Sequence, residues 1–232
     1  MHSTTLRNHW RYSWWKYALL AVACVMGVDL LFAITAYRPP EDKKIELYIC
    51  NGYIDATRLQ EELWPRITER FPDQEELTVM NIDLTSGDIY APMQFSTYVG
   101  AQQGDICLLP ESEFQKLALD GAQYAYMDLT PYIESGVISL RGIDCSGYVY
   151  TDEEGREGIY GIPTDSLFGL LDYAHDPAGG VLCVMAYNGN DENAAAVADL
   201  LLELYRTQKP EGYDEMRQQT LQSQGGGTQI FR

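Results

Sequence analysis

The feature that most constrains this chain is an apolar run near its N-terminus. Residues 17–37, YALLAVACVMGVDLLFAITAY, number 21 and include one charged side chain, Asp29. An α-helix of this length, rising ~1.5 Å per residue, spans roughly 30 Å, about the hydrocarbon thickness of a bilayer. The sequence therefore predicts a transmembrane helix over residues 17–37, preceded by a cytoplasmic tail over residues 1–16. Aromatic side chains that suit a membrane interface gather at its two ends: Trp10, Trp14, Trp15, Tyr17 and Tyr37.

Two other interpretations of this run are weaker. A cleaved signal peptide would also carry basic residues before an apolar segment, but such segments are usually ~7–15 residues long. Lipidation at Cys24 would fit the preceding letters AVA, but apolar residues continue well past Cys24. A permanent anchor is therefore the favoured interpretation.

The orientation of the anchor depends on the charges that flank it. Three basic residues precede the run and three follow it (Arg7, Arg11, Lys16; Arg38, Lys43, Lys44), so the positive-inside rule is nearly balanced. The free amino terminus and the lack of acidic residues before the run favour a cytoplasmic N-terminus. We therefore expect a single-pass protein of the cell membrane, with its C-terminal domain outside the cytoplasm.

The chain after the apolar run is strongly acidic. From Pro39 onward it holds 12 of the 16 basic residues and 33 of the 34 acidic ones, a formal charge of −21. Such a charge repels nucleic acids and anionic lipid headgroups. We expect no nucleic-acid partner, and the chain is long enough for one domain with a hydrophobic core.

Strand-like and helix-like segments alternate through the first half of this domain. Leu59, Leu63 and Ile67 recur every four residues after Asp55, a helix-capping residue, and Pro65 is expected to bend or interrupt that helix. The pattern predicts a parallel sheet covered by helices. The predicted strands cover residues 44–50, 76–84 and 104–110, and the predicted helices cover residues 55–71, 89–103 and 111–122.

The second half has a different pattern. Residues 147–163 predict two strands joined by an acidic turn at Gly155, residues 179–187 a buried strand, and residues 188–208 a helix. From Pro210 the chain is polar and rich in glycine, which predicts a flexible tail over residues 210–232.

The motifs of common enzyme and metal sites are missing from the sequence. His175 is the only histidine after the apolar run, and no CxxC, GxSxG, P-loop or HExxH motif occurs. A weak calcium loop at residues 151–158 is less favoured than a solvated hairpin turn. We therefore expect a non-enzyme without metal or cofactor, whose cysteines after the run, at positions 50, 107, 145 and 183, are buried free thiols.

Three segments resemble the extracellular solute-binding proteins of ABC importers, which have the type II periplasmic-binding fold. They are residues 102–136 (QQGDICLLPESEFQKLALDGAQYAYMDLTPYIESG), 157–171 (EGIYGIPTDSLFGLL) and 181–204 (VLCVMAYNGNDENAAAVADLLLEL). In the first, the matching positions are Gly104, Asp105, Leu108, Leu109, Gly121, Asp128, Leu129, Thr130, Pro131 and Tyr132. The resemblance implies a mostly parallel α/β lobe over residues 38–209, with its first three strands in the spatial order 2-1-3.

One departure from the family concerns its second lobe. Family members usually have a long second lobe between the YGIP strand and the return strand, whereas only 16 residues, Thr164–Gly179, separate them here. The resemblance therefore implies a single lobe with most of the second lobe missing.

Polar residues follow each predicted strand, where ligands bind in open α/β sheets. A turn-forming or helix-capping role is the favoured alternative for these residues. The candidate ligand-binding residues are Asn51, Tyr53, Asp83, Thr85, Ser86, Glu111, Ser112, Thr164, Asp165 and Ser166.

Two functions remain open. The first is a membrane-anchored binding or sensing component of an ABC-type uptake system, with a small polar solute. The second is a non-catalytic assembly subunit that uses the same fold to bind a membrane protein. In either, Asp29 could pair with a polar residue of a partner helix such as that of an ABC permease, and Gly27 would allow close helix approach. Simple tolerance of Asp29 in the span is slightly favoured over this docking role.

Overall fold

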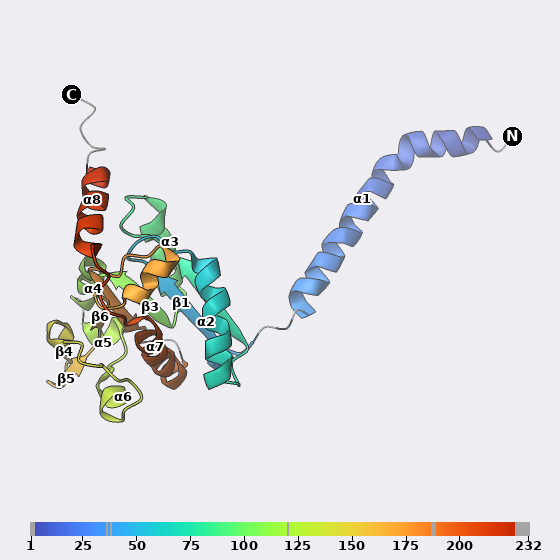
Figure 1. The fold of residues 1–232 in the computed structure, drawn as a ribbon. Helices are drawn as coiled ribbons and strands as arrows, with labels where there is room; N and C mark the ends of the chain where they lie inside the picture. Colours follow the sequence, from blue (N-terminus) through green and yellow to red (C-terminus); the bar gives the residue numbers. More distant parts are fainter. Residues whose placement is uncertain (1–2, 36, 38, 120, 187–188, 226–232) are drawn as a thin grey trace. The chain divides into compact units, whose positions relative to one another are not determined.

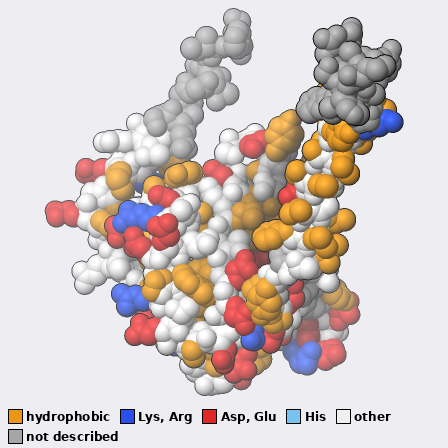
Figure 2. Space-filling view, turned by 90° about the vertical axis from the view of Figure 1, so that its right-hand side faces the viewer, with side chains coloured by type: hydrophobic (Ala, Val, Ile, Leu, Met, Phe, Trp, Pro, Cys, Tyr) orange, Lys and Arg blue, Asp and Glu red, His pale blue; other side chains and the backbone are white. Residues whose placement is uncertain are grey.

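The computed structural model describes residues 3–35, 37, 39–119, 121–186 and 189–225, and the chain forms two compact units, Met1–Pro39 and Pro40–Arg232 (Figure 1). The first unit is helix α1, Ser3–Thr35. Its segment Trp14–Thr35, of 22 residues with a mean hydropathy of 2.3, is long and apolar enough to cross a membrane. Apolar side chains cover the surface of this segment (Figure 2). An anchor and a signal sequence both meet this description.

A five-stranded mixed sheet, with β1 and β3 labelled in Figure 1, forms the centre of the second unit. Its strand order is β2-β1-β3-β7-β6. Strands β1, β2 and β3 are parallel, which confirms the predicted order 2-1-3. Strand β7 is antiparallel to both β3 and β6, so the sheet is mixed, and the expectation of a mostly parallel sheet is not confirmed. The strands are β1 Lys44–Ile49, β2 Glu76–Asn81, β3 Ile106–Pro110, β6 Ile162–Pro163 and β7 Gly180–Val184.

The short connection from β6 to β7 explains the antiparallel half of the sheet. Residues 164–179 fold into the 3₁₀-helix η3, Phe168–Tyr173, and remain at the edge of the sheet where β6 ends. At that edge Thr164 N donates to Gly180 O at 2.9 Å. A chain that returns at the same edge must run antiparallel, because a parallel return requires a crossover to the opposite edge.

The two faces of the sheet bury separate hydrophobic clusters. In β1, Ile45, Leu47 and Ile49 pack on one face and Tyr48 on the other, as the alternation of side chains along a strand requires. Helices α2 (Ala56–Arg70) and α7 (Asp191–Tyr205) cover the first face together with η3. Helices α3 (Tyr90–Gly100), α4 (Glu111–Ala118) and α5 (Ala122–Ala125) cover the second.

Helix α2 forms where the sequence predicts it. Asp55 caps its first turn by accepting a hydrogen bond from Arg58 N at 3.2 Å. Leu59, Leu63 and Ile67 are fully buried, and each such burial contributes ~1.5–3 kcal/mol. Pro65 lies inside the helix without interrupting it, and a bend at this position stays a prediction. Proline removes a single backbone donor here, and the buried stripe on the same helix offsets that loss.

The remaining elements lie between β3 and the C-terminus, apart from the 3₁₀-helix η1 that precedes β1. Strands β4 and β5 form the predicted hairpin, and Gly155 in its turn has a φ of +79°. Helix α8 occupies part of the range predicted as a flexible tail. The buried ring of Tyr213 fixes its first residue by packing edge-on against Phe168 at 5.0 Å between centroids. The bounds are η1 Glu41–Lys43, α6 Thr130–Glu134, η2 Ser146–Tyr148, β4 Val149–Thr151, β5 Glu157–Ile159 and α8 Tyr213–Gly225.

The four cysteines of the second unit are free and buried, as predicted. Cys107 and Cys183 are direct partners across the antiparallel β3–β7 ladder, and both are at most 1% exposed. Burial raises the pKa of both thiols well above the ordinary value. Cys145 lies outside the regular elements and is 5% exposed.

Candidate functional site

The carboxyl ends of β1, β2 and β3 bring most of the predicted binding segments to one edge of the sheet. Leu84 N, after β2, donates to Cys50 O, after β1, at 3.0 Å. Glu111 N, after β3, donates to Gly179 O at 3.0 Å. Residues 51–53, 83–86, 111–112 and 164–166 therefore border the same edge, which we call the carboxyl edge.

Asn51 lies at the centre of the carboxyl edge and is 9% exposed. Neither its amide nitrogen nor its amide oxygen has a hydrogen-bond partner among the described residues. A Cβ atom on Gly180 would lie 2.1 Å from Asn51 Nδ2 and 2.5 Å from Thr164 Oγ1. Only glycine at position 180 lets both polar side chains lie against the start of β7. Thr164 is fully buried and donates its hydroxyl to Pro177 O at 2.6 Å.

His175 is a second buried polar group at this edge. Its Nδ1 lies 3.1 Å from Tyr53 O, and since a carbonyl only accepts, Nδ1 carries the proton. Burial lowers the pKa of His175, against the opposing effects of the Tyr53 carbonyl and of Asp176 and Asp83. The imidazole is therefore neutral at pH 7, and Nε2 is an acceptor without a partner in the described structure.

Other candidate residues at the carboxyl edge are held by local bonds. Asp83 accepts from Thr85 N at 2.8 Å and from its hydroxyl at 2.6 Å, and Ser86 Oγ donates to Asp83 O at 2.9 Å. Asp165 accepts from Gly179 N at 3.1 Å. These contacts are those of turn-forming residues, the alternative that the sequence favoured.

The last candidates differ in their exposure. Tyr53 is 64% exposed, and Glu111 and Ser112 are exposed in the first turn of α4. The hydroxyl oxygen of Ser166 is buried and has no partner within the described part of the chain.

The sequence analysis did not include His175 among the candidate site residues. Its one signal was that no other histidine follows the apolar run.

One cavity outside the core lies away from the carboxyl edge. It measures about 380 Å³ and lies between α5, residues 126–128 and the β4–β5 hairpin. Tyr126 pairs with Met185, and Met127 N donates to Val184 O at 2.9 Å, which places these residues where β7 ends and β3 begins. None of the predicted ligand-binding residues lines this cavity.

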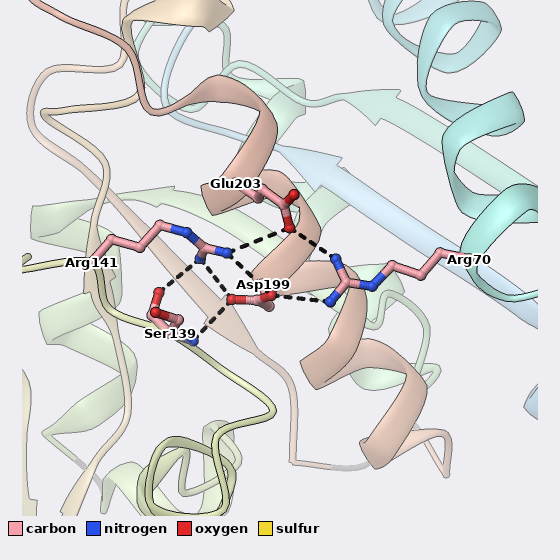
Figure 3. Close-up of polar contacts among 5 residues, drawn as sticks. All are labelled: Arg70, Ser139, Arg141, Asp199 and Glu203. Carbon is pink, nitrogen blue, oxygen red and sulfur yellow. Dashed lines mark hydrogen bonds and ion pairs between the residues drawn. The ribbon is translucent and has the colours of Figure 1, made fainter.

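A buried carboxylate, Asp199 of α7, joins three parts of the unit (Figure 3). It accepts hydrogen bonds from Ser139 N at 2.9 Å and Arg141 Nη1 at 2.7 Å, and Arg70 Nη2 of α2 lies 3.4 Å away. Burial raises the pKa of Asp199, but the bonds from Arg141 and Ser139 and the two positive charges outweigh it, so the pKa is lowered. Glu203 bridges the same two guanidinium groups from an exposed position. This cluster holds α2, α7 and the 139–141 segment together.

Acidic side chains are spread over the surface of the second unit. Figure 2 shows them across one face, with basic side chains beside some of them. The observed surface agrees with the acidic composition, and the described basic residues are largely engaged in ion pairs such as Arg156 with Asp152.

No protein-family model and no curated protein matches this chain. Two solved structures show a partial likeness. An extracellular solute-binding protein family 1 member from Alicyclobacillus acidocaldarius has a TM-score of 0.37 and 15% identity, over 52% of this chain and 28% of that chain. A probable secreted solute-binding lipoprotein from Streptomyces coelicolor has a TM-score of 0.28 and 16% identity, over 55% of this chain and 30% of that chain. The matched region is less than a third of the length of either neighbour, and the likeness assigns this chain no function.

Proposed function

We propose that this chain is a membrane-anchored, extracytoplasmic binding protein that takes a small polar solute at the carboxyl edge. One observation carries the proposal: the amide of Asn51 is buried, yet neither of its polar atoms has a partner among the described residues. A buried polar group without a hydrogen bond costs ~1–3 kcal/mol, and a solute that supplies the bond removes this cost.

The chemistry of the edge indicates the kind of solute. Asn51 offers two donors and one acceptor, His175 Nε2 an acceptor and Ser166 a hydroxyl. A neutral solute with several hydroxyl or amide groups matches this set better than an ion does. We propose no catalytic step, because the neutral His175 has a backbone carbonyl as its nearest polar contact and no nucleophile beside it in the described contacts.

The sequence resemblance supplies the proposed setting. A solute-binding component of an ABC-type uptake system would be anchored by α1, with residues after Pro39 outside the cytoplasm. A cysteine introduced at Ser223 tests this topology. Labelling by an impermeant maleimide in intact cells supports it, whereas labelling only after permeabilisation contradicts it. Cys145 is unsuitable as the probe because it is buried.

The binding proposal is tested with the full chain in nanodiscs, by differential scanning fluorimetry against a library of polar metabolites. We expect at least one neutral polar solute to raise the melting temperature, and Asn51→Ala to abolish that shift. Gln218→Ala removes an exposed amide from α8 and serves as the matched control. A shift that survives in Asn51→Ala would contradict the proposed site.

Exposed apolar side chains favour the assembly subunit as a second candidate. Tyr53, Ile89, Tyr90 and Met93 are 64–76% exposed. Tyr53 belongs to the carboxyl edge, and the other three lie at the start of α3, shortly after the edge residues 83–86. If these side chains form a contiguous apolar surface with a partner-facing side, such a surface commonly marks a protein interface. A silent solute screen, with a membrane protein that co-purifies with wild type but not with Ile89→Asp, would support this candidate.

A further inference from the structure

The cavity of about 380 Å³ beside the β4–β5 hairpin lies apart from the carboxyl edge. The Tyr126–Met185 pairing places it at the end of the sheet where β7 ends, whereas Asn51 lies where β7 begins. Its volume falls in the range of small-molecule sites, ~300–1,000 Å³.

Tyr160 is a buried polar side chain in the wall of this cavity. It is 3% exposed, and the hydrogen bonds of the described residues include none from its hydroxyl, whose oxygen is not among the fully enclosed polar atoms without a partner. The ring is held by an edge-on contact with Tyr150 at 6.3 Å between centroids, and Tyr160 N donates to Tyr148 O at 3.1 Å. Burial raises the pKa of Tyr160, the charges of Asp128 and Asp152 add to this, and the charge of Arg156 opposes it; all three charged residues line the same cavity.

Asp128 presents a fixed carboxylate to the same space. Its Oδ1 accepts from Thr130 N at 2.9 Å at the start of α6, while Oδ2 has no partner among the described residues. The carboxylate lies against Gly158 of β5, where an added Cβ would come within 2.8 Å of it. The position of the Asp128 carboxylate is therefore fixed by the backbone at Thr130 on one side and at Gly158 on the other.

The charge of the cavity wall is strongly negative. Four carboxylates line it and one guanidinium, that of Arg156, so the formal balance is −3. Arg156 pairs with Asp152 through its Nε at 2.8 Å and with Glu154 through its Nη2 at 3.0 Å, and Glu153 is hydrogen-bonded to Tyr124. Asp128 has no basic partner among the described ion pairs, so the wall keeps an excess of acceptors over donors.

We propose that this cavity binds a small organic cation with N–H donors, either a primary amine or a guanidinium compound. Such a cation can donate to Asp128 and to the oxygen of Tyr160, and charged hydrogen bonds of this kind are the strong ones. Tyr124 and Tyr160 also line the cavity, and aromatic rings can attract a cation. The described residues bring no group of three His, Cys, Asp or Glu together for a metal ion, so the geometry favours an organic cation.

The test is isothermal titration calorimetry of agmatine into the full chain in phosphatidylcholine nanodiscs, whose lipid carries no net charge. Butylurea, a neutral compound of similar shape, is the control ligand. We expect agmatine to bind and butylurea to remain silent. Tyr160→Phe and Asp128→Asn should each weaken agmatine binding by about tenfold, the loss of one charged hydrogen bond. Asp128→Asn keeps an acceptor for Thr130 N, so the start of α6 is preserved.

Glu211→Gln is the matched control variant, because it removes one exposed carboxylate that does not line the cavity. We expect its agmatine affinity to equal that of wild type. The proposal is overturned if agmatine fails to bind at millimolar concentration. It is also overturned if Glu211→Gln weakens binding as much as Asp128→Asn, or if butylurea binds equally well.

Discussion

Replacing Asp199 by Asn should destabilise the second unit more than any other change to its surface ion pairs. The Asp199 side chain is 5% exposed, and that of Arg141, its main partner, is 26% exposed. Removing the charge leaves the Arg141 guanidinium half-buried with a single remaining carboxylate, Glu203, at 3.5 Å. Breaking a buried ion pair from one side costs ~3–5 kcal/mol. Since Arg70 and Arg141 retain partial access to water, we expect about 3 kcal/mol.

The measurement is urea unfolding of the full chain in detergent at pH 7, followed by circular dichroism and linear extrapolation. Glu203→Gln is the control, because Glu203 bonds the same two arginines from a side chain that is 52% exposed. Exposed pairs contribute ~0–1 kcal/mol, so this control should differ little from wild type. A loss below ~1 kcal/mol in Asp199→Asn would refute the argument that burial makes this carboxylate decisive.

The same cluster has a pH dependence of known sign. The pKa of Asp199 is lowered in the folded state, so its contribution is present above the unfolded pKa and is lost as the pH falls through the folded one. The wild type should therefore lose its advantage over Asp199→Asn only below pH ~4, the ordinary range of an aspartate.

Three further predictions concern other parts of the chain. Leu108→Asp should cost at least ~3 kcal/mol, because Leu108 is 2% exposed in a strand paired on both sides; near wild-type thermal stability would contradict its central place. Burial raises the pKa of Asp105 from 3.8 to about 7, so its contribution to stability is fully present at low pH and is lost as the pH rises to about 7. Between pH 8 and pH 5.5, the free energy of unfolding of wild type should therefore rise by about 2 kcal/mol relative to that of Asp105→Asn. His175 has an opposite pH dependence, but it is present in both proteins and cancels in the difference. Curves of unfolding free energy against pH that run parallel for the two proteins would refute this. Asp29→Leu should improve membrane insertion and abolish detergent-stable co-purification of a membrane partner, and recovery of the same partners would show that α1 is only an anchor.

Local periodicity was enough to predict the first half of the fold. The four-residue spacing of Leu59, Leu63 and Ile67, the cap at Asp55 and the apolar run at Ile106–Pro110 are properties of neighbouring residues. Each segment selects its structure almost independently of the rest. The parallel order of β2, β1 and β3 came from the family resemblance.

The parts that sequence reasoning missed depend on contacts between distant residues. The direction of β7 follows from how residues 164–179 turn at one edge, and β6 has only two residues. Helix α8 is polar, and its first residue is fixed by the packing of Tyr213 on Phe168. The same holds for the candidate site, where Asn51 and Thr164 meet over Gly180 although more than a hundred positions separate them.

The free thiols of Cys107 and Cys183, neighbours across the β3–β7 ladder, require the sheet to form before oxidants reach them. In an oxidising compartment a thiolate is the form that reacts, and burial in the closed sheet suppresses both its formation and its access to oxidants. Under the proposed export, β3 and β7 of a newly exported chain are still apart, and neither protection exists. The sheet must therefore close before oxidants reach these sulfurs, so the speed of folding decides how many molecules mature with intact thiols. In the mature protein, the rate at which Cys107 becomes accessible to an alkylating reagent would report how often the centre of the sheet opens.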